Sequence, residues 1–558
     1  MPEVIRPLGI LERFYVVRQN VRYYRNVAFT VKYQWNDLKK TLNKSSSVKG
    51  GEANKKDTKL NSSIEILPTP RQQILKILYP TLSALIQKLP SLSMTIRGTK
   101  TSGPLFIQLE EIDLSSLVTF VSVASIEDLG RALEEQHDLE FDQEDESKPL
   151  WRILIGICDE SRNKNKKLTF DLSITFVWHH ILGDGMSSIA IHGAFFEILK
   201  KVVDSNLTEQ SQNLFDPLIK VPSNSTTPLI CPPLEQRLNI QPTLLQIFKE
   251  ASMEYLVPSF LKKHVLGKYW AGDVHSQDIL DFHSRLLMFS LTPEEFEDLV
   301  VLTKKKGTTI NSVLHTAMIF SAIHNLLSDK NEREKSDWSL RTSSPISLRS
   351  YASPQIPLSD IGNYVTKFEF DYRFDTLLEP NRTDPEPTFW KLCHTYRSKL
   401  ISSIPHAIGH VGMLNYLAKD NDAWETFFRN QMESLNMGRS SSLALSNLGK
   451  FPMDLVPSSL IQTEENLESR EISKNPVVDN GNNSGLKIVD MLFSQSPYKV
   501  GPAICIHSVC YNKKLNLSVV YQKGVIADDK KVERFGEGIL KCLRTVSRKG
   551  DIEIGERL

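Results

Sequence analysis

Residues 168–185, LTFDLSITFVWHHILGDG, decide how this chain is interpreted. Large apolar side chains occupy every second position over 168–178, and a period of two over that length predicts a β-strand. His180 falls on the same face of this strand, so its imidazole is expected to point into the protein. The letters GDG at 183–185 then predict a tight turn, in which glycine adopts backbone angles that other residues avoid.

A histidine at the end of such a strand suits general-base chemistry. Its unperturbed pKa of about 6.5 leaves much of it neutral near pH 7, and a positioned base typically gives roughly 10²–10⁴-fold in rate. Asp184 either orients the imidazole of His180 or braces the turn through an arginine. The neighbouring His179 is expected to face the other way. The alternative interpretation is a hydrogen-bonded core histidine, the more common fate of a lone histidine at an apolar strand end.

The sequence does not predict a metal site. His180, Asp184 and His192 have the spacing H-x₃-D-x₇-H, which differs from that of known zinc sites, and no H-E-x-x-H segment is present. Six cysteines are scattered without a C-x-x-C pair, which argues against a disulfide framework and suits a reducing compartment. They are found at positions 158, 231, 393, 505, 510 and 542.

Composition indicates a globular protein with room for two or more domains. The chain has 558 residues, of which 40% are hydrophobic and 24% charged, and its formal net charge of +1 gives no reason to expect a nucleic-acid partner. Charged residues interrupt the first 14 positions, where a secretory signal would be apolar. We therefore expect a cytoplasmic protein, and leave peripheral contact with the endoplasmic reticulum or lipid droplets open.

Two polar stretches, 43–63 and 463–485, are too poor in apolar residues to order themselves and are interpreted as surface insertions. Residues 205–242 contain six prolines and predict an extended connection. The connection divides the chain into an N-terminal lobe, 1–204, and a C-terminal lobe, 243–558.

Both lobes mix strand and helix signals, which predicts an α/β protein of packed sheets and helices. Strands are expected at 26–35, 151–158, 503–511 and 515–521. Helices are expected at 71–89, kinked or divided at Pro80, from 292 onward, at 309–327 and at 529–546. The last helix is amphipathic and is expected to pack on the core, because Gly536 and Gly538 would weaken it as an isolated membrane-surface helix.

The segment HHILGDG at 179–185 resembles the HHxxxDG motif of the acyltransferase superfamily with the chloramphenicol-acetyltransferase fold. Within this superfamily the chain most resembles the fungal alcohol acetyltransferases, whereas the DFGWG motif of the plant branch is absent. Further stretches similar to the superfamily are 82–96, 149–152, 309–322, PISLR at 345–349 and Gly362-Asn363; those similar to the fungal group are 6–27, SNLG at 446–449, and 493–521.

The resemblance implies an α/β fold of two lobes, each a mixed sheet flanked by helices, with an active-site channel between them. Acetyl-CoA or another acyl-CoA would enter as co-substrate from one side and the acceptor from the other. His180 would deprotonate the acceptor and later protonate the departing thiolate. Asp184 would face away from the channel and pair with Arg349, with Gly185 in the supporting turn. Ser446 and Asn447 would either stabilise the oxyanion or hold their own turn.

The resemblance therefore implies an alcohol O-acetyltransferase that forms acetate esters. One alternative is N-acetylation of long-chain or sphingoid-like amines, since one histidine can take a proton from either acceptor. Another is a non-catalytic descendant that binds a thioester or a protein. We expect small-molecule partners, no nucleic acid, no metal and a monomer.

Overall fold

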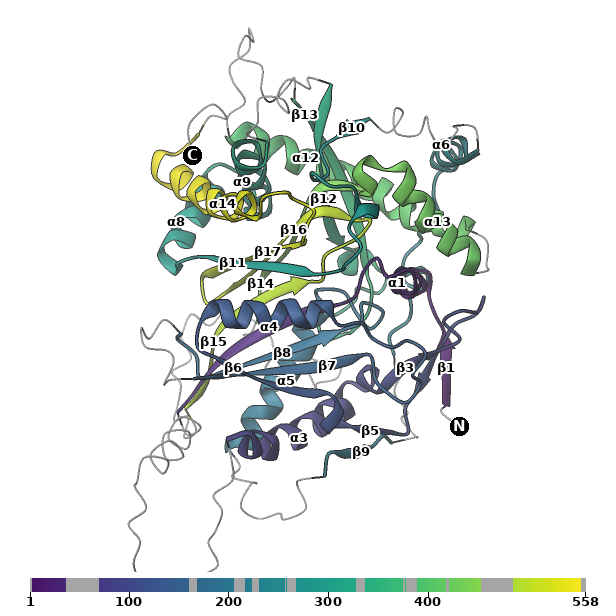
Figure 1. The fold of residues 1–558 in the computed structure, drawn as a ribbon, viewed down its shortest axis with the longest axis vertical. Coiled ribbons are helices and arrows are strands. Elements are labelled where there is room, and N and C mark those ends of the chain that lie inside the picture. The colour runs from purple at the N-terminus through teal and green to yellow at the C-terminus, as the bar shows by residue number, and fades with distance from the viewer. Residues whose placement is uncertain are drawn as a thin grey trace, which may run out of the picture.

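Two β-sheets form the centre of the molecule, and helices cover them (Figure 1). The structure is a computed structural model, and it describes residues 3–36, 70–159, 168–204, 216–222, 230–255, 257, 267–327, 337–374, 377, 389–417, 421–452 and 485–552. In Figure 1 one sheet lies above the other, with helix α4 (Ile126–Asp138) between them and in contact with both. The two-lobed α/β architecture is thereby confirmed.

The sheet of the first lobe has five strands in the order β15-β2-β8-β7-β6. Strands β6 and β7 are parallel and the other pairs are antiparallel, so the sheet is mixed. The strands are β2 (Val27–Trp35), β6 (Val118–Val123), β7 (Trp151–Cys158), β8 (Leu172–Trp178) and β15 (Leu486–Gln495). Helices α3 (Pro70–Lys88) and α5 (Ser187–Asp204) pack side by side on one face.

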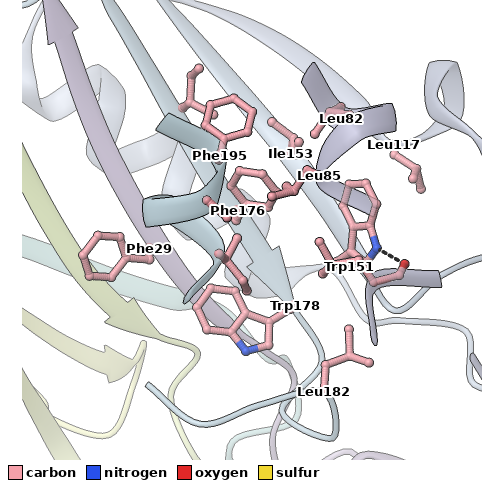
Figure 2. Packing of buried hydrophobic residues seen from close by; sticks show 14 of the residues in the cluster. Phe29, Leu82, Leu85, Leu117, Trp151, Ile153, Phe176, Trp178, Leu182 and Phe195 are labelled. Atoms are coloured by element: carbon pink, nitrogen blue, oxygen red, sulfur yellow. Dashed lines mark hydrogen bonds between the residues drawn. The ribbon is translucent and has the colours of Figure 1, made fainter. Parts of the chain in front are cut away.

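Strand β8 holds the middle of this sheet, and all seven of its residues are buried. Phe176 packs edge-on against Phe195 of α5, and Trp178 and Leu82 of α3 belong to the same buried cluster (Figure 2). Trp151 on the neighbouring strand donates its indole N–H to the carbonyl of residue 92 at 2.7 Å, so its one polar atom is satisfied. Full burial of each such side chain stabilises the fold by roughly 1.5–3 kcal/mol. This packing fixes the strand end from which the histidine turn begins.

The sheet of the second lobe has seven strands in the order β10-β12-β14-β16-β17-β11, with β13 paired to β12, and it is also mixed. Its strands are β10 (Lys268–Tyr269), β11 (Ser284–Leu291), β12 (Trp338–Ser347), β13 (Val365–Arg373), β14 (Ser441–Lys450), β16 (Pro502–Tyr511) and β17 (Lys514–Gln522). Its helices are α8 (Pro293–Lys305), α9 (Ile310–Asn325), α12 (Phe389–Gly412) and α14 (Asp529–Lys549).

The two lobes exchange chain segments, and this corrects the expected division at 205–242. Strand β15 belongs to the range 243–558, yet it pairs along its whole length with β2 of the first lobe. Helix α1 (Ile10–Asn20) comes from the range 1–204 and packs against α13 (Asn421–Ser434). Pairing of this kind depends on contacts between residues more than 400 positions apart, for which the sequence carries no local signal.

The smaller elements lie around these lobes. Part of the proline-rich range 205–242 is regular, because β9 (Leu218–Lys220) pairs with β5 (Glu111–Asp113). The remaining elements are the three-stranded sheet of β1 (Glu3–Pro7), β4 (Leu105–Gln108) and β3 (Met94–Arg97), and helix α6 (Leu244–Tyr255). The polar stretches 43–63 and 463–485 lie outside the described residues.

Most of the expected helices are confirmed. Of the two alternatives expected at Pro80, division is wrong, because α3 continues through it, and the hydroxyl of Thr81 donates to the carbonyl of Ile77 in the adjoining turn. The apolar stripe of α14 is buried against α8 and α9, as expected. Gly536 allows close packing on Phe289 of β11 and Gly538 on Ser321 of α9, since a Cβ atom at either position would come within 2.3 Å of that side chain. Across the described residues, no helix combines the length and apolarity needed to span a membrane.

Candidate active site

His180 lies directly after β8, in the turn that leads into α5. The turn is closed by the indole N–H of Trp178, which donates to the carbonyl of Gly183 at 2.9 Å. His180 retains 5% of its exposure and is thus buried, as the strand pattern predicted. His179 contacts Phe141, and its Nδ1 accepts a hydrogen bond from the backbone N–H of Ile181 at 3.0 Å. The two adjacent histidines therefore meet different surroundings.

Asn363 determines which nitrogen of His180 carries the proton. The side-chain nitrogen of Asn363 donates to the carbonyls of His180 and Ile181, at 2.8 and 2.9 Å. Its Oδ1 therefore faces His180 Nδ1, at 3.0 Å. Because a carbonyl oxygen can only accept, Nδ1 must hold the hydrogen and Nε2 is left with a lone pair. The imidazole is consequently a base at Nε2 with its ring plane held.

Two tyrosines cover the imidazole. The ring of Tyr15, on α1, stacks on His180 with 3.8 Å between ring centroids and an interplanar angle of 8°. Tyr24 lies with its ring centroid 5.7 Å from the imidazole, and Tyr498 stacks on Tyr24 at 4.8 Å. These rings come from α1, from the segment after it and from the loop after β15, so both lobes contribute to the site.

Burial is the main cause of the unusual acidity of this histidine. Loss of hydration lowers the pKa of His180 to about 4. Asp184 and the hydrogen bond that Nδ1–H donates to Asn363 oppose this shift, while Arg18 adds to it. A histidine with so low a pKa is neutral throughout the physiological range, which is the form required of a base.

Asp184 is turned away from the imidazole and is part of a buried ion pair. Its Oδ1 lies 3.1 Å from Arg349 Nη2, and the two side chains are 5% and 4% exposed. Oδ1 also accepts hydrogen bonds from the backbone N–H and hydroxyl of Ser187, and Oδ2 accepts one from the backbone N–H of Tyr364. Arg349 further donates to the carbonyls of residues 357 and 360. The pairing expected from the resemblance is present, and its geometry is that of a brace between two loops.

Gly183 and Gly185 are required in the histidine turn because their neighbours leave no room for a side chain. Neither Gly183 nor Gly185 has a positive φ, so the expectation that glycine supplies unusual backbone angles here is wrong. A Cβ on Gly183 would lie 2.5 Å from the Ser187 hydroxyl, and one on Gly185 would lie 2.9 Å from both Leu448 and Phe493. Close packing of the turn against these neighbours explains why both positions are glycine.

Residues 446–449, expected as a turn, lie instead within strand β14, where its pairing with β16 is irregular, and Leu448 packs close to Gly185. Asn447 Oδ1 accepts from the backbone N–H of Gly449 and from the hydroxyl of Ser508, both at 2.9 Å. Gly449 has φ of 73°, a conformation that favours glycine. The side-chain oxygen of Asn447 is thus occupied in holding this irregular part of β14. Ser446 lies on β14, half-buried, beside Asn447.

His192, the third member of the spacing considered for a metal, lies in the core. Its Nε2 donates to the carbonyl of Phe29 at 3.0 Å, and the ring packs edge-on against Phe176. Across the described residues, no three His, Cys, Asp or Glu side chains are arranged to hold a metal ion. Two hollows that the surface does form, between α8 and α14 and beside β5 and β9, include none of the predicted site residues.

The structure brings His180, Asp184, Gly185 and Arg349 together, and it adds residues that sequence reasoning did not assign to the site. Those are Tyr15, Arg18, Tyr24, Asn363 and Tyr498. In the sequence, Asn363, the N-terminal segment and the stretch that includes Tyr498 carry only a resemblance to the family. The density of tyrosine and arginine over residues 13–25 was the one available signal.

The two-lobed fold is shared with solved structures of low sequence identity. It resembles the trichothecene 15-O-acetyltransferase TRI3 from Fusarium sporotrichioides with a TM-score of 0.61 and 12% identity, over 97% of this chain and 95% of that one. It also resembles polyketide synthase associated protein 5 from Mycobacterium tuberculosis, with a TM-score of 0.52 and 14% identity, over 99% and 100% of the two chains. At these identities the likeness shows the fold alone. The chain therefore has the two-lobed fold that the HHxxxDG resemblance implied.

Sequence comparison identifies the family. The model described as alcohol acetyltransferase matches residues 131–545, so the chain belongs to the alcohol acetyltransferase family. A probable alcohol acetyltransferase from Aspergillus fumigatus, crmB, is 32% identical over 146 residues, which are 24% of this chain and 28% of the relative. A second from Fusarium pseudograminearum, FCK4, is 25% identical over 232 residues, 41% and 44% of the two chains. The matched stretches thus span less than half of either relative.

Proposed function

We propose that this protein transfers an acetyl group from acetyl-CoA to the hydroxyl of a small-molecule alcohol, with His180 as the general base. The observation that carries the proposal is the state of the imidazole. It is neutral, its Nδ1–H is held by Asn363, and Nε2 remains as the basic atom. Membership of the alcohol acetyltransferase family supports the same chemistry.

In the proposed reaction the acceptor oxygen attacks the thioester carbonyl carbon while Nε2 of His180 takes its proton. The carbon–sulfur bond of the resulting tetrahedral intermediate then breaks, and the proton on Nε2 passes to the sulfur. The products are the acetate ester and free CoA. No covalent link to the protein is needed, and the imidazole ends each cycle in its starting state.

Several groups would stabilise the imidazolium that exists between these two steps. Asn363 Oδ1 accepts from Nδ1–H in either charge state. The face of Tyr15 lies 3.8 Å from the imidazole, and a cation over a tyrosine face gains about 1–2 kcal/mol when desolvated. Asp184 favours the charged form electrostatically. The low pKa of the resting histidine therefore does not prevent transient protonation.

The roles of the remaining residues are part of the proposal. Asp184 and Arg349 hold the histidine turn to the loop that carries Asn363, and Asp184 adds its electrostatic effect on the imidazolium. The occupied side chain of Asn447 supports a structural role in the irregular part of β14, so we propose Ser446 as the donor to the oxyanion. In keeping with the expectation from the sequence, we also propose a monomer that acts on small molecules in the cytoplasm.

Product detection by mass spectrometry tests the proposed reaction. The purified full-length protein is supplied with acetyl-CoA and short-chain alcohols, fusel-type alcohols or sterols. Acetate ester is expected, and its rate should fall by roughly 10²-fold or more in His180→Ala. His283→Ala is the matched control, because that side chain is 62% exposed and lies outside the site. Ester formation that survives in His180→Ala, or no ester from folded wild-type protein, would refute the proposal.

A further inference from the structure

Arg18 brings a positive charge close to the proposed base. It lies one helical turn after Tyr15 on α1, and its guanidinium carbon is 5.1 Å from the ring centroid of Tyr24 and 4.7 Å from that of Tyr498. Tyr24 in turn lies 5.7 Å from the imidazole of His180. The cation and the base therefore share one aromatic wall.

This charge is not neutralised locally. Among the described residues no carboxylate lies within ion-pair distance of Arg18, which is only partly buried. Asp184, the carboxylate that acts on the imidazole, is already paired with Arg349, and Glu12, the carboxylate of the same helix as Arg18, is paired with Arg6. The charges that act on the imidazole are thus one cation without a carboxylate partner and one carboxylate already paired. The other titratable groups around them are neutral: the phenols of Tyr15, Tyr24 and Tyr498, the thiol of Cys505 and the imidazole of His179.

We propose that Arg18 determines acceptor specificity by excluding ammonium groups from the neighbourhood of His180, so that the site accepts neutral hydroxyl compounds. This inference rests on the proposed acetyl transfer and names its acceptor class. It separates the two acceptors that the sequence left open, since an alcohol is neutral and an aliphatic amine is charged near pH 7.

The size of the effect follows from elementary electrostatics. Two like charges about 8 Å apart in a partly buried site repel enough to change a binding equilibrium by roughly 30-fold. With a pKa near that of lysine, an aliphatic amine at pH 7 has roughly 10³ ammonium ions for each free base. No unpaired carboxylate among the described residues near His180 is available to attract that ammonium ion. Amine acceptors would therefore have to enter as the scarce free base.

The effect of Arg18 on the base agrees with this assignment. Arg18 lowers the pKa of His180, whereas Asp184 raises it. The same field that disfavours an imidazolium disfavours an ammonium ion in that space. Replacing the arginine should therefore move the acid limb of the pH–rate profile to higher pH and, at the same time, admit ammonium compounds.

Matched acceptors and matched variants test the proposal. 2-Phenylethanol and 2-phenylethylamine share a carbon skeleton and differ in charge at pH 7. Their binding is measured by titration calorimetry, and their acetylation by mass spectrometry between pH 7 and 9, for wild type, Arg18→Lys and Arg18→Met. Methionine packs well against aromatic rings, so the aromatic wall is kept. Arg13→Met is the control, since Arg13 is a cation of the same helix stacked on Trp424.

Wild type and Arg18→Lys should bind the alcohol in preference to the ammonium ion, and their amine acetylation should rise about tenfold per pH unit from pH 7 to 9. Arg18→Met should improve ammonium binding relative to alcohol binding at pH 7 by roughly 30-fold. Arg13→Met should leave the ratio unchanged. Equal binding of both acceptors by wild type, or an equal change for both in Arg18→Met, would overturn the inference. Absence of turnover with any acceptor would refute the proposed reaction, while the binding ratio would still decide the role of Arg18.

Discussion

Asn363 Oδ1 lies 3.0 Å from His180 Nδ1, and the amide nitrogen of Asn363 is fixed by two backbone carbonyls. The asparagine therefore cannot turn its N–H towards the imidazole without losing both of those bonds. One side chain thus selects the tautomer of the histidine and anchors the turn that carries it. Everything proposed for Nε2 depends on this relationship.

Replacing Asn363 should impair catalysis more than folding. In Asn363→Ala the imidazole loses its tautomer control, and we expect kcat/KM to fall by roughly 10–10²-fold. The two carbonyls left without a donor should cost about 1–3 kcal/mol in stability. Steady-state kinetics and urea unfolding measure the two effects.

Asn363→Asp is the informative companion variant. It keeps an acceptor for Nδ1–H and adds negative charge, so the pKa of His180 should rise and the acid limb of the pH–rate profile should move to higher pH. An unchanged limb in Asn363→Asp would contradict this assignment.

The pH dependence of the reaction should reveal the buried state of the base. With the pKa of His180 at about 4, the imidazole remains neutral down to pH 5.5, so kcat/KM should stay within about twofold between pH 8 and 5.5. A histidine with an ordinary pKa of about 6.5 would be roughly tenfold less available at pH 5.5. Initial rates with a neutral alcohol, in protein confirmed as folded at each pH, distinguish the two cases. A fall in kcat/KM centred near pH 6.5 would mean that the imidazole of His180 is hydrated in the working enzyme.

The Asp184–Arg349 pair should contribute to stability and leave the base chemically intact. Removal of one partner of a buried pair leaves an uncompensated charge, so Asp184→Ala and Arg349→Met should each lose about 3–5 kcal/mol. The double variant should lose less than the sum of the two, because no charge remains unpaired. Denaturant unfolding of the four proteins gives this double-mutant cycle. Additive losses would show that the two side chains do not act as a pair.

Sequence reasoning reached the fold and the centre of the site because both have local signatures. The alternating run to Trp178 predicts β8, and the spacing between His180 and Asp184 identifies the turn. It failed where the outcome depends on distant partners. Ser173 and Thr175, on the polar face of the same strand, would be assigned to solvent by alternation, yet both are buried because the second face of the sheet is also covered.

The residues that complete the site had no such signature. Asn363 lies 183 positions from His180, and its contact requires the loop after β12 to meet the end of β8. Tyr15 contacts the imidazole from α1, and α1 is held in place by its packing against α13, which is distant in the sequence. From the sequence, a tyrosine in an N-terminal helix can be predicted to be buried, but not which residue its ring contacts. That contact with His180 is determined by the tertiary structure.

Low pH should destabilise the protein, over a pH range set by the pKa values of its buried histidines in the folded and unfolded states. His137, His192, His315 and His507 are each fully enclosed and hydrogen-bonded, and burial lowers the pKa of each to about 3. In the unfolded chain these side chains have pKa values near 6.5, so between about pH 6.5 and 3 the unfolded state binds more protons than the folded one. Stability is therefore fully present above pH 6.5 and is lost as the pH falls, by up to about 1.4 kcal/mol per histidine per pH unit.

Thermal unfolding followed at intervals from pH 8 to 5 measures this loss, and the melting temperature should be constant above pH 7 and decline steeply below 6.5. His315 offers a test of a single contributor, because its ring is stacked on Tyr396 at 3.7 Å and hydrogen-bonded to Thr342. His315→Gln keeps a polar side chain that cannot take up a proton in this range, so the decline should become shallower even if the variant is less stable at pH 8. A melting temperature that does not respond to pH between 7 and 5 would mean that these histidines are solvated or already paired with acids in the folded protein.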